Sequence, residues 1–348
     1  MSRYADLQQK LRAQPRTWLV TGVAGFIGSN LLEKLLLLDQ RVVGLDNFSN
    51  GFRHNLDGVR EAVSSAQWAR FTFHEGDTRR IEDCQAACRG VDVVLHQAAL
   101  GSVPRSIADP LRSHQSNVDG FLNVLLAVRD AKIPRLVFAS SSCVYGDHPG
   151  LPKIEGAIGQ LLSPYAATKR ITELYAGVFA RTYGLSIFGL RYFNVFGPRQ
   201  NPNGAYAAVI PRWFTDLIEG RPITINGDGE TSRDFSYIDN VVAANLLAAA
   251  APDPREASLL NIACGERTTL NALFAAMREL VGRDFPAAAG VEPLRQPERA
   301  GDVRHSLADI SAARAAIGYE LQTSLRAGLG QTYQWYRRQI APVAGVAL

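Results

Sequence analysis

Long apolar runs are scarce in this sequence of 348 residues. The densest run, Leu35–Leu38, ends at Asp39, whereas a membrane-spanning helix needs about 20 predominantly apolar residues in a row. The first segment, Met1–Arg16, is polar and charged, without the apolar core of a signal peptide. We therefore expect a cytoplasmic protein that does not enter a membrane.

Cysteine is scarce, and so is charge of one sign. The chain has four cysteines: Cys84, Cys88, Cys143 and Cys264. Their spacing is not that of a metal site, and the reducing cytoplasm disfavours disulfides. The net charge is only +4, and the Lys and Arg residues are scattered along the chain. We therefore expect no nucleic-acid partner and, because the six histidines form no spaced set, no metal.

The first half of the chain alternates apolar runs with stretches of helical length. The runs that we expect to be strands are Thr17–Thr21, Arg41–Leu45, Phe71–His74, Val91–His96, Leu136–Ser140 and Ser186–Arg191. Several are almost continuously apolar, as parallel strands buried on both faces must be. The first stretch between runs, Phe26–Leu38, is expected to be a helix. This alternation predicts an α/β fold with a doubly wound parallel sheet.

After about Arg191 the composition becomes richer in Gly, Pro and Asn. We expect a second, smaller region of mixed α/β structure over one mouth of the sheet. The expected division assigns 1–190, with returning segments at about 232–255 and 303–315, to the sheet domain. It assigns 191–231 and 256–302 to the smaller region and 316–348 to a C-terminal helical segment.

A glycine turn joins the first expected strand to the first expected helix. Gly22, Gly25 and Gly28 recur every third residue, which permits a tight turn, close approach of a pyrophosphate, and close helix–strand packing. Asp46 ends the second strand, where a carboxylate accepts hydrogen bonds from a ribose and repels a 2′-phosphate. We therefore expect NAD rather than NADP, although Arg53 nearby weakens that discrimination. Asp77, after the third strand, is expected to meet the adenine amino group.

A tyrosine and a lysine form the expected catalytic pair. Tyr165 and Lys169 are four residues apart after Pro164, so a helix would place both on one face. A nearby ammonium favours the phenolate and lowers the pKa of the tyrosine toward working pH. The serine run Ser140–Ser142 ends the fifth expected strand, at the sheet edge where such folds bind ligands. A serine hydroxyl there can share the substrate proton with Tyr165.

These segments together resemble the extended short-chain dehydrogenase/reductase family over nearly the whole chain. The resemblance rests on TGVAGFIG, GDTRR, HQAA, SSSCVYG, YAATK, LRYFNVFGPRQ and RDFSYIDN. Within that family the chain looks most like the UDP-sugar 4-epimerases. It is most similar to the bacterial UDP-N-acetylglucosamine 4-epimerases, through HQAALGSVPRS, PNGAYAAVIP and INGDGETSRDF.

The resemblance implies a Rossmann fold and a role for each catalytic residue. Tyr165 would be the general base for the sugar 4-hydroxyl, Lys169 would hold the nicotinamide ribose, and Ser141 would be the catalytic serine. Hydride would pass from C4 to NAD, giving a 4-keto sugar, and return to its opposite face.

The resemblance also implies the residues that bind the two ligands. The implied NAD-binding residues are Gly22, Gly25, Phe26, Ile27, Gly28, Asp46, Asn47, Asn50, Gly51, Asp77, Gln97, Ala98, Ala99, Tyr165, Lys169 and Tyr192. The implied UDP-sugar-binding residues are Gly101, Ser102, Val103, Ser141, Ser142, Asn194, Ala208, Val209, Thr224, Asn226, Arg233, Arg299, Asp302 and Ser306. The two arginines Arg233 and Arg299 would engage the diphosphate. The family also implies a homodimer formed through Gln115–Ala131 and Tyr165–Tyr183.

Two positions bear on the reaction and the sugar. Ser142 and Cys143 stand where nucleotide-sugar 4,6-dehydratases carry Asp and Glu, so dehydration lacks its acid and base. Ser306 follows Arg299 by seven residues, where strict glucose/galactose epimerases carry a bulky residue. We therefore expect interconversion of UDP-N-acetylglucosamine and UDP-N-acetylgalactosamine, with UDP-glucose and UDP-galactose as further candidates. The alternative for Ser306 is a helix-capping role with Asp309.

Two other functions stay open at this point. One is 4-epimerisation of an acidic sugar, UDP-glucuronate or UDP-N-acetylgalacturonate, for which Arg105 and Arg304 are candidate carboxylate partners. The other is a non-catalytic NAD-binding regulator. The presence of Ser141, Tyr165 and Lys169 together argues against the regulator.

Overall fold

A seven-stranded parallel sheet forms the centre of the protein, and its strand order is β11-β6-β5-β4-β1-β2-β3. The computed structural model describes residues 2–203, 207–254, 256–298 and 303–340. The strands are β1 (Thr17–Thr21), β2 (Arg41–Asp46), β3 (Phe71–Glu75), β4 (Val93–His96), β5 (Arg135–Ser141), β6 (Ser186–Tyr192) and β11 (Ser258–Ile262). The predicted doubly wound α/β fold is confirmed, and each of the six predicted runs forms a strand.

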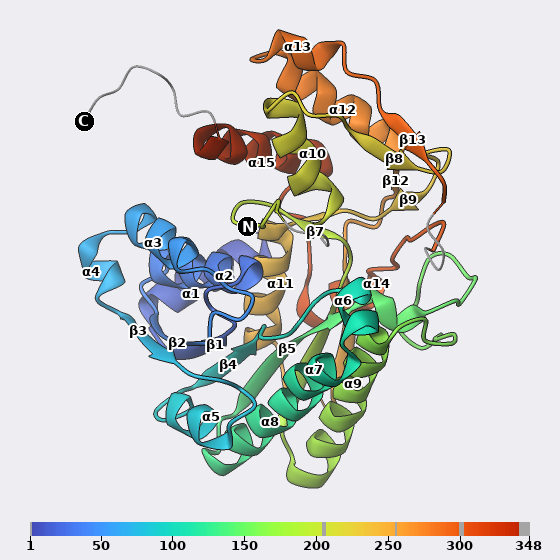
Figure 1. Ribbon diagram of the computed structural model, residues 1–348. Coiled ribbons are helices and arrows are strands. Elements are labelled where there is room, and N and C mark those ends of the chain that lie inside the picture. Colours follow the sequence, from blue (N-terminus) through green and yellow to red (C-terminus); the bar gives the residue numbers. More distant parts are fainter. Residues whose placement is uncertain (1, 204–206, 255, 299–302, 341–348) are drawn as a thin grey trace.

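Helices cover both faces of the sheet (Figure 1). On one face lie α1 (Arg3–Ala13), α2 (Phe26–Leu37), α3 (Arg53–Ala62), α4 (Ser65–Trp68) and α11 (Ile238–Ala250). On the other lie α5 (Ile81–Ala87), α8 (Gly120–Asp130) and α9 (Pro164–Tyr183). The four residues of β4 are all buried, because apolar side chains pack against the sheet from both sides. The central strands therefore have the continuous apolar sequence from which they were predicted.

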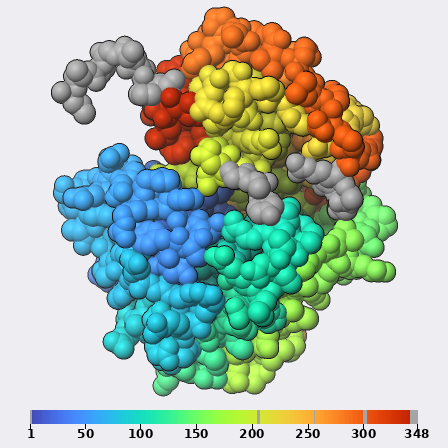
Figure 2. Space-filling model, in the orientation of Figure 1, coloured from blue at the N-terminus to red at the C-terminus, as the bar shows by residue number. Residues whose placement is uncertain are grey.

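A smaller region lies over the carboxyl edge of the sheet, at the top of Figure 1. Its helices are α10 (Val209–Ile218), α12 (Leu270–Gly282), α13 (Pro286–Ala289) and α15 (Leu325–Ile340). Its strands are β8 (Thr224–Asn226), β9 (Ser232–Arg233), β12 (Thr268–Thr269) and β13 (Leu294–Gln296), which pair as β8–β13 and β9–β12. Aromatic side chains hold it together, for example Trp213 against Phe274 with ring centres 5.9 Å apart. A groove separates this region from the sheet domain in the space-filling view (Figure 2).

Short elements connect the two regions. They are α6 (Val103–Ala108), α7 (Pro110–His114), the π-helical turn η1 (Gln115–Asp119), the 3₁₀ turn η2 (Ser142–Tyr145), β7 (Val195–Phe196), β10 (Ser236–Tyr237) and α14 (Ser311–Ile317). Within the described ranges, no helix combines the length and apolar character needed to cross a bilayer.

Two features differ from the expectation. Strand β11 pairs with β6 in the central sheet, although its residues fall in the 256–302 segment expected in the smaller region. The first helix expected at the dimer interface, Gln115–Ala131, is not uniform, because the π-helical turn η1 precedes α8. The remaining domain boundaries stay a prediction.

Candidate active site

A cavity of about 430 Å³ lies at the carboxyl ends of the central strands. Among described residues, its wall contains every residue that the sequence assigned to NAD binding. These are Gly22, Gly25, Phe26, Ile27, Gly28, Asp46, Asn47, Asn50, Gly51, Asp77, Gln97, Ala98, Ala99, Tyr165, Lys169 and Tyr192. Of the residues assigned to the UDP-sugar, Gly101, Ser141 and Asn194 share this wall. The cavity thus gathers the expected cofactor residues and a small part of the expected sugar site.

The glycine turn between β1 and α2 requires its glycines. Gly22 has a φ of +69°, which L-residues with a side chain rarely adopt. A Cβ on Gly28 would collide with the carbonyl oxygen of Gly22. The turn therefore leaves bare backbone at the start of α2, where free N–H groups favour phosphate. The residues present fit the pyrophosphate of a dinucleotide.

Asp46 anchors this turn from the end of β2. Its carboxylate accepts hydrogen bonds from the backbone N–H groups of Ala24, at 2.9 Å, and Phe48, at 2.8 Å. Burial raises the pKa of Asp46, while these backbone hydrogen bonds work in the opposite direction. Arg53 stacks its guanidinium 4.7 Å from the ring centre of Phe48 and lies 3.6 Å from Glu75. The carboxylate that faces the cavity is consistent with the ribose-binding role expected of Asp46.

Asp77 lies on the same side of the cavity. Its carboxylate accepts hydrogen bonds from Arg79, at 2.6 Å, and from the amide of Asn47, at 2.9 Å. Burial works to raise the pKa of Asp77, but the hydrogen bonds from Arg79 and Asn47 outweigh it and the pKa is lowered. Asp77 is therefore ionised and able to accept from a cofactor amino group.

Tyr165 and Lys169 lie on the first turns of α9, as their spacing predicted. Ser163 caps this helix and Pro164 occupies its first turn. The backbone N–H of Tyr165 donates to the hydroxyl of Ser106 at 2.9 Å, which ties α9 to α6. The Tyr165 side chain is hydrogen-bonded to Ser141 at the end of β5. The three expected catalytic residues thus meet at one point of the cavity wall.

The charges at this point favour proton transfer when a cation is bound. Burial raises the pKa of Tyr165 above its ordinary value, and the hydrogen bond with Ser141 works to lower it. Burial lowers the pKa of Lys169 to about 8, whereas Glu173 and Cys143 work to raise it. The ammonium donates to the carbonyl oxygen of Ala139 at 2.8 Å. A nicotinamide cation beside Tyr165 would add the attraction that the phenolate needs.

A ring of three hydrogen bonds supports the cofactor side of the cavity. The Tyr192 hydroxyl donates to Gln97 at 3.1 Å and accepts from Asn245 at 2.8 Å, and Gln97 donates to Asn245 at 3.1 Å. Gln97 and Tyr192 were expected, whereas Asn245 on α11 was not. Nothing in the sequence around Asn245 indicates that its side chain meets two residues of distant strands.

Asn117 is a second supporting residue that the sequence did not reveal. Its side chain bonds both backbone groups of Leu100 and donates to Thr168 at 3.0 Å, so it joins the loop after β4 to α9. It lies in the π-helical turn η1, a distortion often found at functional sites. His96, for which no catalytic role was expected, is bonded to Thr21, and burial lowers its pKa to about 3.

The other expected sugar-binding residues lie outside the wall of this cavity. Ser102 caps α6, Val103 begins α6 and Ser142 begins η2. Ala208 and Val209 stand at the start of α10, while Thr224 and Asn226 belong to β8 and Arg233 to β9. Ser306 is joined to β9, since its N–H donates to the Ser232 carbonyl at 3.0 Å. Arg299 and Asp302 lie outside the described residues.

Several lining residues were not assigned to either ligand, although more than half of them stand inside the motifs quoted above. They are Leu45, Ser49, Gly76, Thr78, Leu100, Ser116, Ala139, Ser140, Val195 and Gln200. Most of them precede or follow a predicted residue directly, so neighbourhood in the chain was the available signal.

Comparison with known proteins agrees with this geometry. A sequence model of the NAD dependent epimerase/dehydratase family matches residues 18–263. The chain is 34% identical over 328 residues to a UDP-glucose 4-epimerase of Mycolicibacterium smegmatis, covering 92% of this chain and 98% of that protein. It is 32% identical over 335 residues to a UDP-glucuronate 4-epimerase of Thermodesulfobacterium geofontis, covering 94% and 98%.

Among solved structures, the chain is similar to a UDP-N-acetylglucosamine 4-epimerase from Methanobrevibacter ruminantium M1 in complex with UDP-N-acetylmuramic acid. The TM-score is 0.85 and the identity 36%, over 93% of this chain and 99% of that one.

Proposed function

Because this chain belongs to the NAD dependent epimerase/dehydratase family and is an NAD-dependent UDP-sugar 4-epimerase, we propose that it interconverts UDP-N-acetylglucosamine and UDP-N-acetylgalactosamine. The relatives divide among glucose, glucuronate and N-acetylglucosamine substrates, so the choice of sugar has to come from this chain's own residues. UDP-glucose and UDP-galactose are the weaker second pair.

Ser306 is the observation that carries the proposal. The segment around Ser306 is held at two points. The N–H of Ser306 donates to the carbonyl oxygen of Ser232 on β9, and Ala308 forms a β-bridge with Lys153 in the loop that follows η2. The resemblance to the epimerases implies that this position adjoins the sugar C2 substituent, and a serine there would leave room for an N-acetyl group. A tyrosine in the same place would fill that space.

The catalytic roles follow from the cavity wall. The glycine turn would hold NAD, which would supply the hydride acceptor and donor for C4 of the sugar. Tyr165 removes the proton of the 4-hydroxyl and gives it back, and Ser141 shares that proton through its hydroxyl. Lys169 holds a positive charge beside Tyr165, which favours the phenolate.

Residues near Tyr165 and on the smaller region are proposed to bind the UDP-sugar. Gly101 leaves room beside Tyr165, since a Cβ there would lie 3.9 Å from the phenol oxygen. Asn194 and Arg233, which flank the groove, are the proposed diphosphate ligands. Arg233 donates to the carbonyl oxygens of Ser232 and Arg304, which directs its guanidinium along β9.

A second cavity keeps an acidic UDP-sugar as the other candidate. It measures about 360 Å³, and its lining combines Lys153 and Arg304 with the carboxylate of Asp147, two histidines and apolar side chains. Lys153 is only 4% exposed, and burial lowers its pKa. A sugar carboxylate would find a cation there.

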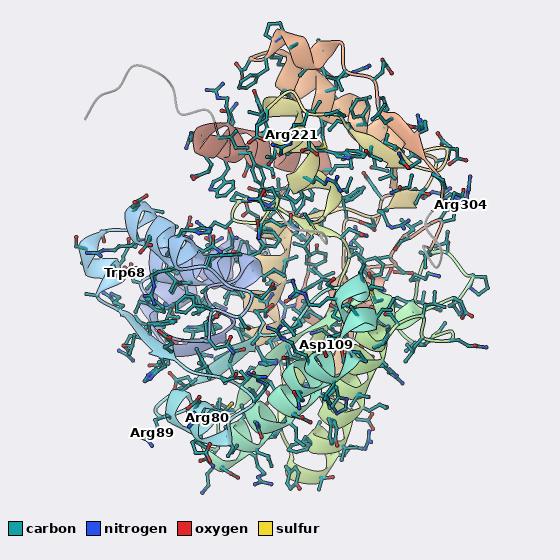
Figure 3. All side chains as sticks on the ribbon, in the orientation of Figure 1. Trp68, Arg80, Arg89, Asp109, Arg221 and Arg304 are labelled. Atoms are coloured by element: carbon teal, nitrogen blue, oxygen red, sulfur yellow. The ribbon has the colours of Figure 1, made fainter. Side chains whose placement is uncertain are left out.

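The two arginines expected to bind such a carboxylate are engaged elsewhere. Arg105 donates to Asn50 on the cofactor side at 3.1 Å. Arg304 lies at the outer edge of the smaller region (Figure 3) and pairs with Asp228 at 2.6 Å and Glu298 at 3.0 Å. Their charge is thus compensated, and the acidic sugar takes second place.

Substitution of Ser306 tests the choice of sugar. In Ser306→Tyr, kcat/KM for UDP-N-acetylglucosamine should fall about 100-fold or more, since a misfit of this kind costs roughly 3 kcal/mol. Activity on UDP-glucose should fall less than about threefold, because the pocket still accepts a hydroxyl. Ser306→Ala is the control and should keep the preference of the wild type. Equal losses for both sugars in the Tyr variant would remove Ser306 from the selection of substrate.

We further propose a homodimer formed through α8 and α9. Two apolar side chains one turn apart on α9 are exposed, Leu174 at 53% and Val178 at 46%. Leu122 and Leu126 on α8 are half-buried, and they pack against the apolar cluster formed by α5, α8 and α9. Exposed apolar side chains at helical spacing are typical of a surface that packs against another helix.

A further inference from the structure

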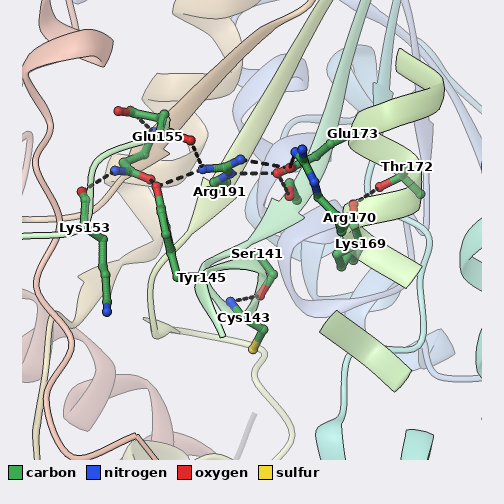
Figure 4. Close-up of polar contacts among 12 residues, drawn as sticks. Ser141, Cys143, Tyr145, Lys153, Glu155, Lys169, Arg170, Thr172, Glu173 and Arg191 are labelled. Carbon is green, nitrogen blue, oxygen red and sulfur yellow. Dashed lines mark hydrogen bonds and ion pairs between the residues drawn. The ribbon is translucent and has the colours of Figure 1, made fainter. Parts of the chain in front are cut away.

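A buried ion pair lies directly behind the catalytic residues (Figure 4). The guanidinium of Arg191 on β6 grips the carboxylate of Glu173 on α9 through two bonds, Nε–Oε1 at 2.7 Å and Nη2–Oε2 at 2.9 Å. Both side chains are fully buried, at 0% exposure. A buried pair of this kind gives little net stability, because desolvation of the two charges offsets their attraction. Stability alone therefore does not explain its place in the fold.

The carboxylate of Glu173 is connected to both catalytic elements. Glu173 follows Lys169 by four residues on α9, which puts the two side chains on one face of the helix. It also accepts a hydrogen bond from Ser140 at 2.7 Å, and Ser140 directly precedes Ser141 on β5. Lys169 bonds the carbonyl oxygen of Ala139, the residue before Ser140. Two residues of α9 thus hold two consecutive residues of β5, Ala139 and Ser140, directly before Ser141.

Arg191 fixes the position of that carboxylate from the other side. Its Nη1 atom donates to the Tyr145 hydroxyl at 3.0 Å and to the carbonyl oxygen of Glu155 at 2.9 Å. Tyr145 in turn donates to Asn261 of β11 at 2.6 Å. The hydrogen bonds of the guanidinium thus lead to α9, to η2 and to the loop after η2. Arg191 therefore cannot shift without moving its surroundings.

We propose that Glu173, held by Arg191, is a positioning residue of the reaction. It sets the end of β5 that carries Ser141, and it provides the negative charge that keeps Lys169 an ammonium. It acts through these two residues and does not reach the substrate.

The other ionisable groups near Lys169 do not replace this charge. On its own helix Lys169 neighbours Tyr165, which burial keeps in the neutral form in the absence of a bound cation. Across from it lie His96 of β4, whose pKa burial lowers to about 3, and Cys143 of η2. The effect of Glu173 on the Lys169 pKa is larger than that of Cys143. Around Glu173 itself are two arginines, Arg191 and the partly exposed Arg170 at 3.0 Å.

Removal of the Glu173 charge should therefore lower the pKa of Lys169 further. In Glu173→Gln, the alkaline limb of the kcat profile should move about one pH unit toward lower pH. At pH 8 kcat should fall about fivefold, while KM changes less than about twofold, since a positioning residue for proton transfer affects the chemical step. Glu173→Asp should restore part of the profile.

Arg170→Met provides the matched control. It removes one hydrogen bond to the same carboxylate and leaves the pair with Arg191 intact, so the pH profile should stay that of the wild type. If Glu173→Gln does not fold because Arg191 is left uncompensated, the neutral double variant E173Q/R191M is measured in the same way. Melting temperatures are recorded for each variant.

The assay uses the NAD-loaded enzyme and the UDP-sugar that the wild type converts fastest. The inference therefore rests on the 4-epimerase activity and is independent of the acetylated substrate. A displaced alkaline limb with unchanged KM supports the proposal. A profile of unchanged shape, whether kcat is retained or falls together with the melting temperature, overturns it and leaves Glu173 a purely structural residue.

Discussion

Lys169 carries its ammonium into the interior of the protein, where it donates a hydrogen bond to the carbonyl oxygen of Ala139. Burial disfavours the charged form and lowers the pKa to about 8, from an ordinary value of 10.5. The charge is nevertheless what Tyr165 requires, because an ammonium stabilises the phenolate. Stability and activity are therefore opposed at this residue.

The Lys169→Met substitution should raise the stability of the protein at neutral pH and remove its activity. The folded-state pKa lies below the unfolded value, so the folded protein binds fewer protons between pH 8 and 10.5, and wild-type stability rises across that interval. The variant has no such charge to bury. At pH 7 it should melt at a higher temperature than the wild type, by about 2–4 °C for each kcal/mol relieved, and the gap should close as the pH approaches 10.5.

Thermal unfolding followed by circular dichroism over this pH range provides the measurement. The same variant should lose nearly all turnover. Lys10→Met, on the surface of α1, is the control and should show no pH-dependent gap. A Lys169→Met protein that melts below the wild type at pH 7 would show that the bond to Ala139 outweighs the cost of burial.

At the scale of elements, the central strands were predictable because strands that are buried on both faces have nearly continuous apolar sequences. Strand β4 is apolar up to its last residue, His96, and such a run has few alternatives to a buried parallel strand. Strand β11 was missed because it contains Asn261, a polar residue that is fully buried. Its side chain is satisfied by Tyr145, Lys153 and Asp309, which come from three other parts of the chain. Sequence reasoning does not supply those partners.

The candidate site shows the same difference between residues that local sequence indicates and residues that depend on distant partners. The glycine turn and the Tyr165–Lys169 pair depend on spacing within one turn or one helix, so local sequence indicates them. Asn117, Asn245 and Arg191 act by joining distant elements, and their neighbours in sequence say nothing of it. Five residues expected at the sugar lie on or at the start of elements of the smaller region, and only the resemblance to the epimerases singled them out: Ala208, Val209, Thr224, Asn226 and Arg233.

At the scale of the whole molecule, the apolar surface of α9 predicts the assembly. The double variant L174E/V178E should convert the dimer into a monomer, because two buried carboxylates without partners would oppose association. Light scattering after size-exclusion chromatography gives the mass directly. Leu294→Glu, which alters an exposed leucine of β13 on the smaller region, is the control and should leave the dimer intact. A wild-type protein that elutes as a monomer would contradict the proposed interface.

In the proposed arrangement, the cofactor lies against the wall formed by the sheet, and the sugar lies between that wall and the smaller region. The most direct test of this account is the initial rate of conversion of UDP-N-acetylglucosamine, UDP-glucose and UDP-glucuronate by the purified protein with NAD supplied. We predict that the acetylated sugar is converted fastest, with UDP-N-acetylgalactosamine as the product. Faster conversion of UDP-glucuronate would contradict the role given to Ser306 and assign the sugar pocket to the cavity beside Lys153.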